Sequence, residues 1–251
     1  MTADLTLLHL YPQELGIFGD VGNVLALRRR AEWRGLTVDI VEHHRGGAVP
    51  ERADLVHIGN GARSGVIAVQ SDVMRIRSAL SEWIDADVPV LAVASGWQLL
   101  GRSLDIEGEP VHTAGVFPST AVVGGQRRVG NVVMQTADGL AMGFENHAAI
   151  TTLDEGATPF GTDLTKGIGN GDGTDGVLVH ASIGTNLGGP LLPLNPATAD
   201  RLLAAALART DRELPPIGGE WAAIADAAAA EARQSMAAAV TGAKGWLVAG
   251  N

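Results

Sequence analysis

The chain has 251 residues, no cysteine and a formal net charge of −10. The lack of cysteine excludes disulfides, thiolate metal sites and a cysteine nucleophile. The acidic balance argues against a general binder of nucleic acid or of anionic membranes. No apolar run reaches the roughly 18 residues of a membrane span, and the first residues lack the features of a signal peptide. The sequence therefore predicts a cytoplasmic protein with one α/β domain, or such a domain with an appendage.

Apolar strands alternate with helices over the first hundred residues. The expected strands are 5–10, 37–41, 54–58 and 88–93. The expected helices are 23–34, which Gly35 ends, 71–83, which Ser71 caps, and a short helix after residue 95. This alternation indicates a mostly parallel sheet with helices on both faces.

The pattern of alternating strands and helices ends at about residue 111. Segments 116–136 and 141–152 are expected to form short, β-rich pieces punctuated by glycine, and residues 167–176 form a turn cluster. Helices are expected at 196–209 and 220–240, separated by a Pro-Pro-Ile-Gly-Gly break. We therefore expect a main domain over 1–210 and a helical extension over 211–251. Its apolar residues Trp221, Ile224 and Met236 could anchor a partner, or the helix could equally pack back on the chain's own sheet.

The stretch VPVLAVASGWQLLG, residues 88–101, predicts a buried strand, a tight turn and a helix. Several classes of hydrolase hold a nucleophile at such an elbow. The residue at the tip is Ala94, whose methyl side chain cannot attack a carbonyl group. The sequence therefore raises the question of which function this turn has without a reactive side chain at its tip.

Six motifs in order answer part of this question: YPQELGIFGDVGN, GNG, GWQLLG, RRVGN, GFENH and GTNLGGPLLPLNPATAD. Over residues 5–205 they resemble the GatD-like class I glutamine amidotransferases of the cobyric acid synthase type. The resemblance implies a class I glutamine amidotransferase-like fold with a mostly parallel sheet, a β-rich second half and a C-terminal helical extension. It also implies a glutaminase subunit of a lipid II isoglutaminyl synthase, which works beside a Mur-ligase-like, MurT-type subunit in peptidoglycan synthesis. No cofactor or metal is implied.

The resemblance also shows what this chain lacks. The family elbow Cys-x-Gly-x-Gln corresponds to residues 94–98, so Ala94 occupies the nucleophile position. The family's Gly-Thr-Tyr-Leu-His-Gly-Pro corresponds to residues 184–190, so Gly188 occupies the base position. Removing one member of such a pair costs on the order of a millionfold in kcat. Further departures are Ala62-Arg63 for Gln-Asp and Ala148-Ala149-Ile150 for Gly-Gly-Arg.

Some candidate residues remain around the expected pocket. Ser95 is a displaced nucleophile in one interpretation and a small filler in the other, which we favour. His147 and His180 are candidate bases for it; we expect a hydrogen-bonding role for His147 and a core position in a strand for His180. Asp20, the counterpart of the family's acid, is expected either to cap the helix that follows it or to stabilise the turn before that helix.

The other candidates are ligand-binding positions. Arg127 is the favoured counterpart of the arginine that holds the α-carboxylate of glutamine, with Arg128 as its alternative. The glycine loop can offer backbone N–H groups to an oxyanion or form a tight turn. The candidate ligand-binding set is Gly59, Gly61, Gln98, Arg127, Arg128, Asn131 and His147.

The sequence favours a degenerate amidotransferase-like subunit that docks to a Mur-ligase-like ATP-dependent partner. One alternative is an active glutaminase whose cysteine was replaced in the laboratory, which the second loss at Gly188 disfavours. Others are a Ser95-dependent hydrolase and a sensor that binds glutamine or a related amino acid. The chain has no GxxxxGK[ST] loop, so the partner would carry the ATP chemistry.

Overall fold

The computed structural model describes residues 3–241. Its first sheet has six strands in the order β10-β11-β4-β3-β1-β2, of which only the β10–β11 pair is antiparallel. The central strands β3 and β4 are buried along their whole length, as continuous apolar runs predict. The strand bounds are β1 Leu5–Leu10, β2 Val38–His43, β3 Leu55–Ile58, β4 Val90–Val93, β10 Val177–Val179 and β11 Ser182–Thr185.

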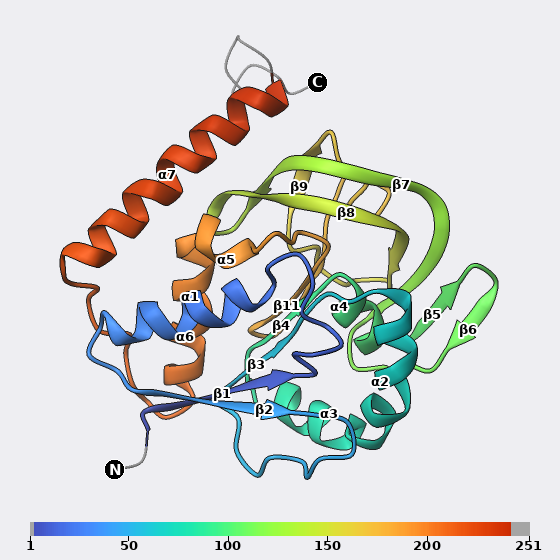
Figure 1. The fold of residues 1–251 in the computed structure, drawn as a ribbon, viewed down its shortest axis with the longest axis horizontal. Helices are drawn as coiled ribbons and strands as arrows, with labels where there is room; N and C mark the ends of the chain where they lie inside the picture. The colour runs from blue at the N-terminus through green and yellow to red at the C-terminus, as the bar shows by residue number, and fades with distance from the viewer. Residues whose placement is uncertain (1–2, 242–251) are drawn as a thin grey trace.

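Helices cover both faces of this sheet (Figure 1), which confirms the predicted α/β architecture. Each face has its own apolar core, and the sheet contributes alternate side chains to both. One core packs against α1 (Val21–Glu32) and α6 (Pro196–Ala208). The other packs against α2 (Arg63–Arg75), α3 (Arg77–Asp85) and α4 (Ser95–Leu100).

The middle of the chain forms a separate five-stranded sheet in the order β6-β5-β7-β8, with β9 paired to β7. Its strands are β5 Ser103–Ile106, β6 Glu109–Val111, β7 Ser119–Thr136, β8 Gly139–Leu153 and β9 Thr162–Thr165. The predicted β-rich segments thus form one long curved hairpin, β7–β8, that arches over the first sheet (Figure 1). Its register shifts between Val123 and Arg128, and such an irregularity bends a ribbon.

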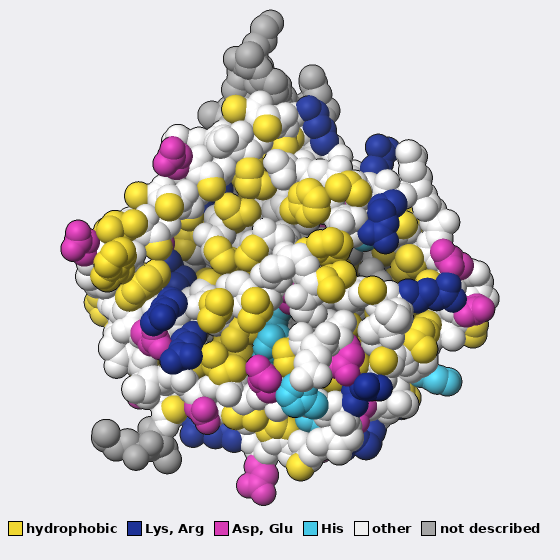
Figure 2. All heavy atoms as spheres, in the orientation of Figure 1, with side chains coloured by type: hydrophobic (Ala, Val, Ile, Leu, Met, Phe, Trp, Pro, Cys, Tyr) yellow, Lys and Arg dark blue, Asp and Glu magenta, His cyan; other side chains and the backbone are white. Residues whose placement is uncertain are grey.

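The last helix, α7 (Glu220–Thr241), lies beside α1 and α5 (Leu191–Leu194). Near its C-terminal end, Met236, Ala237 and Val240 pack on side chains of β7 and β8. Further back, Asp226 pairs with Arg30 at 2.6 Å. Between these attachments runs a groove of about 540 Å³, lined by α1, α5 and α7. Figure 2 shows hydrophobic side chains gathered on this face. Trp221, near the start of α7, is 72% exposed.

Two expectations about local structure are wrong. The helix expected from Ser71 begins at Arg63, and the chain bends at Ile76 before α3. His180 does not lie in a core strand: it follows β10 in a turn, is half exposed and lies 3.1 Å from Asp87. No helix within residues 3–241 is long and apolar enough to span a membrane.

Candidate functional site

The elbow between β4 and α4 has the geometry of a nucleophile turn. Ala94 adopts a φ of +46° and a ψ of −112°, which side-chain-bearing residues rarely accept. Its N–H donates to Thr185 O at 2.7 Å, and its carbonyl accepts from Gln98 N at 2.9 Å. The strained backbone is therefore held from both sides.

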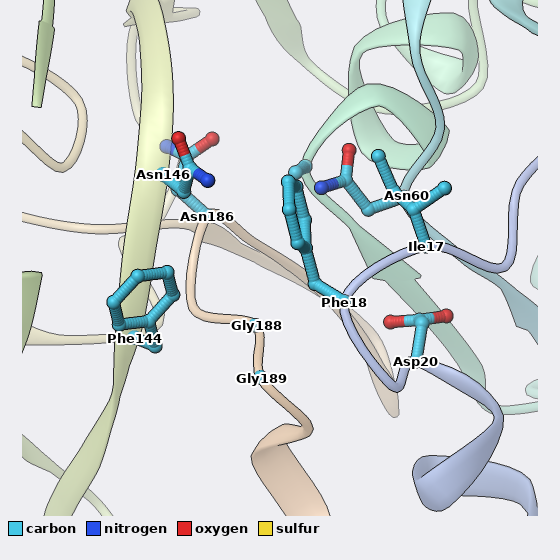
Figure 3. A pocket seen from close by; sticks show the side chains of 10 residues that line it. Ile17, Phe18, Asp20, Asn60, Phe144, Asn146, Asn186, Gly188 and Gly189 are labelled. Atoms are coloured by element: carbon cyan, nitrogen blue, oxygen red, sulfur yellow. The ribbon is translucent and has the colours of Figure 1, made fainter. Parts of the chain in front are cut away.

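Ala94 and Gly188 line one small cavity of about 10 Å³, barely the space of one water. Figure 3 shows its walls: Asp20 and Phe18 come from the loop before α1, and Phe144 comes from β8. A Cβ atom at Gly188 would meet Phe144 O at 3.8 Å and Val93 Cγ1 at 3.9 Å, so a side chain can start there. The structure thus brings the two predicted vacant positions together.

Asp20 is buried and belongs to a polar pair that the sequence did not suggest. Its Oδ2 accepts from Nε2 of His57 at 2.7 Å, and its Oδ1 accepts from Nδ2 of Asn23 at 3.1 Å. It stands at the N-cap of α1 but makes no side-chain cap bond, so the expected cap is wrong, whereas its place in the turn that leads into α1 agrees with the expected alternative, a turn role. Nδ1 of His57 lies 3.1 Å from Leu91 O, and the ring makes both bonds only if each nitrogen carries a proton.

A larger cavity of about 320 Å³ adjoins the first and shares Ile17, Phe18, Asn60, Ala94 and Asn146 with it. Four of the departures from the expected motifs also line this cavity: Ala62, Arg63, Ala148 and Ala149. Arg63 is held at the rim by ion pairs with Glu107 and Glu109. The departures therefore cluster around one place in the fold.

Ser95 lines the same cavity, but its hydroxyl is already engaged. Its Oγ accepts from Gly61 N at 2.7 Å and lies 3.1 Å from Oδ1 of Asn60, to which it donates. The N–H of Ser95 donates to the same Oδ1 at 3.4 Å. No histidine is among the hydrogen-bond partners of Ser95 in the described chain, which favours the filler role over the nucleophile.

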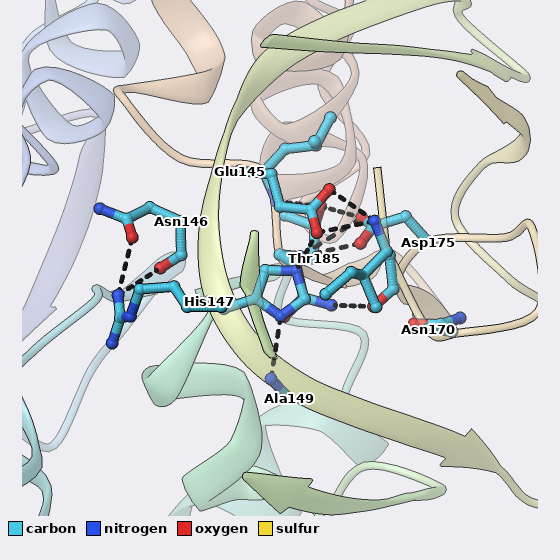
Figure 4. Close-up of polar contacts among 12 residues, drawn as sticks. Glu145, Asn146, His147, Ala149, Asn170, Asp175 and Thr185 are labelled. Atoms are coloured by element: carbon cyan, nitrogen blue, oxygen red, sulfur yellow. Dashed lines mark hydrogen bonds and ion pairs between the residues drawn. The ribbon is translucent and has the colours of Figure 1, made fainter. Parts of the chain in front are cut away.

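His147 lines the cavity from β8 and leads into a buried polar cluster (Figure 4). Its Nδ1 accepts from Ala149 N at 3.2 Å, and its Nε2 lies 2.8 Å from Glu145, out of line for a hydrogen bond. Glu145 accepts from Ile168 N. Asp175 is fully buried, and this burial raises the pKa of its carboxyl group.

This cluster was not predicted as a unit. Glu145 lies in the GFENH motif and Asp175 in the glycine-rich turn, about thirty residues away. Only the presence of acidic residues inside two otherwise apolar or glycine-rich segments could have signalled it. Asp175 accepts from Thr185 and Asn186, so the cluster anchors the strand that leads to Gly188.

Residues 6–196 match the family of CobB/CobQ-like glutamine amidotransferase domains. The chain belongs to this family. It is 31% identical to the GatD subunit of the glutamine-hydrolysing lipid II isoglutaminyl synthase of Staphylococcus aureus strain N315, over 82% of this chain and 86% of that protein. It is also 31% identical to the GatD subunit of Streptococcus pneumoniae strain R6, over 84% and 85%.

Solved glutamine amidotransferase structures share the fold. PurLQS from Thermotoga maritima matches with a TM-score of 0.56 at 10% identity, over 84% of this chain and all of that one. The glutaminase domain of Trypanosoma brucei CTPS with bound acivicin matches with a TM-score of 0.51 at 12% identity, over 86% and 98%. These likenesses confirm the class I amidotransferase-like architecture.

The structure brings only some of the predicted ligand-binding residues of this family member to the cavity. Gln98 and Arg127 line it, as do Gly61 and His147. Nη1 of Arg127 donates to Oδ1 of Asn146 at 2.7 Å. The remaining predicted residues, Arg128, Asn131 and Gly59, are not among the lining residues; Arg128 and Asn131 are exposed on β7.

The glycines of the GNG loop are explained by close packing. A Cβ atom at Gly59 would lie 1.9 Å from Oδ2 of Asp20, and one at Gly61 would lie 2.4 Å from Cδ2 of Leu15. Neither position therefore has room for a side chain. The described residues contain no cluster of three or more His, Asp or Glu able to hold a metal ion.

Proposed function

We propose that this member of the family is a non-catalytic subunit that docks to a ligase and stabilises or regulates it. The observation that carries the proposal is the pair of positions facing the small cavity, where a methyl group and a hydrogen stand at Ala94 and Gly188. A cysteine nucleophile needs an adjacent base to act on a carboxamide. Neither group is present, so glutamine hydrolysis by the family mechanism is not expected.

The GatD relatives are subunits of lipid II isoglutaminyl synthases, which supports a peptidoglycan precursor as the substrate of the complex. We propose a Mur-ligase-like, MurT-type protein as the partner, with the ATP chemistry on that subunit. Without a glutaminase, this ligase would use free ammonia or another amine. The departures clustered around the cavity support a pocket that no longer performs the ancestral reaction.

The experiment is co-expression with a Mur-ligase-like protein of the MurT type, followed by assays of the purified complex. We expect a stable heteromer that forms amide from ammonium salts and not from glutamine. A matched control is the ligase alone, which should be less stable or less active with ammonia. Glutamine-dependent amidation, or a chain that remains monomeric beside the ligase, would overturn the proposal.

The pocket also favours a second role, that of an amino-acid sensor. Gln98 is 7% exposed, and its side chain lines the cavity. Arg127 lies at the same cavity and can bind a carboxylate. Calorimetry tests this role: glutamine or glutamate should bind, and Arg127→Ala should weaken the binding. If calorimetry detects no binding of any amino acid, the sensor role is excluded and only the docking role remains.

A further inference from the structure

We propose that the Ser95 hydroxyl occupies the position where the oxygen of a ligand carboxamide would otherwise bind. The elbow then lacks a binding position for substrate as well as a nucleophile and a base. This inference rests on the proposed loss of catalysis: besides the missing nucleophile and the missing base, it adds a blocked hydrogen-bond donor. The hydroxyl takes the place of a ligand oxygen as the acceptor for the N–H of Gly61, which donates to Oγ of Ser95 at 2.7 Å. The ligand class it excludes is a primary carboxamide or carboxylate, whose oxygen would otherwise accept from Gly61.

The reason for this assignment is the chemistry of elbows. Where a strand–turn–helix elbow holds a nucleophile, the N–H of the next residue and an N–H from a facing loop bind the developing oxyanion. Here the next residue is Ser95 and the facing loop is Gly59–Gly61, which contacts it directly. Both N–H groups are engaged internally, one by Oγ of Ser95 and the other by Oδ1 of Asn60.

The surroundings have the properties of a ligand site once the hydroxyl is removed. Ser95 is only 7% exposed, and its side chain borders the cavity of about 320 Å³. The side chain of Gln98, also 7% exposed, lines the same cavity. Ser95→Ala would leave the Gly61 N–H without its acceptor, and a buried donor left without a partner favours any ligand oxygen that can reach it. Ser95→Ala would therefore free the Gly61 N–H for a ligand oxygen in the cavity that the Gln98 side chain also lines.

The first test measures binding without chemistry. We expect Ser95→Ala to bind glutamine at least tenfold more tightly than the natural chain in calorimetry, with asparagine and alanine as weaker ligands. The Gly61 amide, followed by hydrogen exchange, should lose protection in Ser95→Ala and regain it with glutamine. Ser71→Ala, at an exposed serine on α2, is the matched control and should change neither quantity. Equal affinity and equal Gly61 protection in Ser95→Ala and the natural chain would overturn the inference.

The second test measures chemistry after the missing groups are restored. Ala94→Cys with Gly188→His supplies a nucleophile and a base, and the new thiol is unique because the chain has no other cysteine. Attack on the glutamine carboxamide releases ammonia and forms a thioester, which water then cleaves to glutamate. Adding Ser95→Ala to this pair should raise kcat on the order of a hundredfold, the usual effect of one oxyanion donor.

The pH dependence of alkylation of the introduced thiol reports whether the introduced imidazole pairs with it, independently of Gly61. We expect the same lowered thiol pKa with and without Ser95→Ala, and a large difference in kcat. Equal kcat in the two backgrounds, with the thiol pKa lowered in both, would contradict the inference. If the imidazole does not pair with the thiol, the calorimetry and hydrogen exchange decide alone. Glutamine hydrolysis by the natural chain would instead refute the proposed function, so the two failures are distinguishable.

Discussion

Ala94 retains a backbone conformation that a nucleophile requires and a methyl group does not. Its φ of +46° lies where non-glycine residues are strained by about 1–3 kcal/mol. The bonds to Thr185 and Gln98 impose this conformation, because β4 pairs with β11 up to the residue before the turn. The strain is thus a property of the sheet, and it remains after the reactive group has gone.

This strain predicts an unusual response to glycine. Ala94→Gly removes the strain and loses only a methyl group, so the free energy of unfolding should change by less than about 1 kcal/mol. Ala92→Gly, in the extended part of the same buried strand, is the control and should cost more than about 1 kcal/mol. Urea unfolding of the two variants gives the comparison. Equal destabilisation of both would show that the elbow is relaxed.

At the same scale, the sequence predicted those site residues that belong to contiguous motifs. Ala94 and Gly188 were located from the elbow and from the Gly-Thr-Asn-Leu-Gly-Gly-Pro stretch, and the structure places them at one cavity. The Asp20–His57 pair was missed because Asp20 lies in the loop before α1 and His57 lies on β3, far away in the sequence. Neither has a neighbour in sequence that signals its partner, so only the packing of β3 against the loop before α1 brings them together.

At the scale of elements, the sequence predicted the bounds of β1 and the starts of α6 and α7, but not the start of α2. β1 was predicted with the bounds it has, because Asp4 precedes its apolar run and Tyr11-Pro12 follow it. α2 was missed up to Ser71 because its N-cap is Ala62, which makes no side-chain cap bond and gives no start signal. The length of the β7–β8 hairpin was also missed, since its glycines suggested turns where the ribbon instead bends.

α7 divides into a packed and an unpacked part. Met236, Ala237 and Val240 contact β7 and β8, whereas Trp221 and Ile224 near its start are largely exposed. Aromatic residues such as Trp are enriched at the centres of protein interfaces, and Ile224 adds apolar surface beside Trp221 on the same helix. We therefore expect the C-terminal end of α7 to hold the chain together and its N-terminal end to contact the ligase.

Paired variants separate these two roles. Trp221→Ala with Ile224→Ala should leave the free energy of unfolding within about 0.5 kcal/mol and weaken the ligase complex at least tenfold. Deletion of 216–251 should weaken the complex and also lower the free energy of unfolding by about 2–4 kcal/mol. Light scattering gives the affinity, and urea unfolding gives the stability. An unchanged complex in the double variant would remove α7 from the interface.

For the molecule as a whole, two buried groups make stability fall in acid. Burial and the nearby His57 lower the pKa of His9 from 6.5 to about 4, so the unfolded chain binds the extra proton between these values. Burial opposes ionisation of Asp72, but hydrogen bonds from Gly46, His43 and other donors lower its pKa from 3.8 to about 2. Both shifts mean that the unfolded chain takes up protons first, so stability is lost as the pH falls.

The two windows are separable by experiment. Between pH 6.5 and 4, the natural chain should lose on the order of 3 kcal/mol through His9, and His9→Leu should remove this slope. Between about pH 4 and 2, a further loss of about 2 kcal/mol should depend on Asp72 and be absent in Asp72→Asn. Guanidinium unfolding at half-unit pH steps measures both. A slope that survives each substitution would assign acid sensitivity to other groups.

The connection between α6 and α7 has a consequence for proteolysis. Residues 208–213 are exposed, and they include Arg209 and Arg212, two cleavage sites for trypsin. The side chain of Arg212 forms an ion pair with Asp4, which is itself partly exposed, and its backbone N–H donates to Leu207 O at 3.2 Å. Brief digestion should therefore nick the chain here before the sheet is attacked. α7 would then stay attached through Asp226, Arg233 and its apolar end, and mass spectrometry under non-denaturing conditions would show the two fragments still bound to each other.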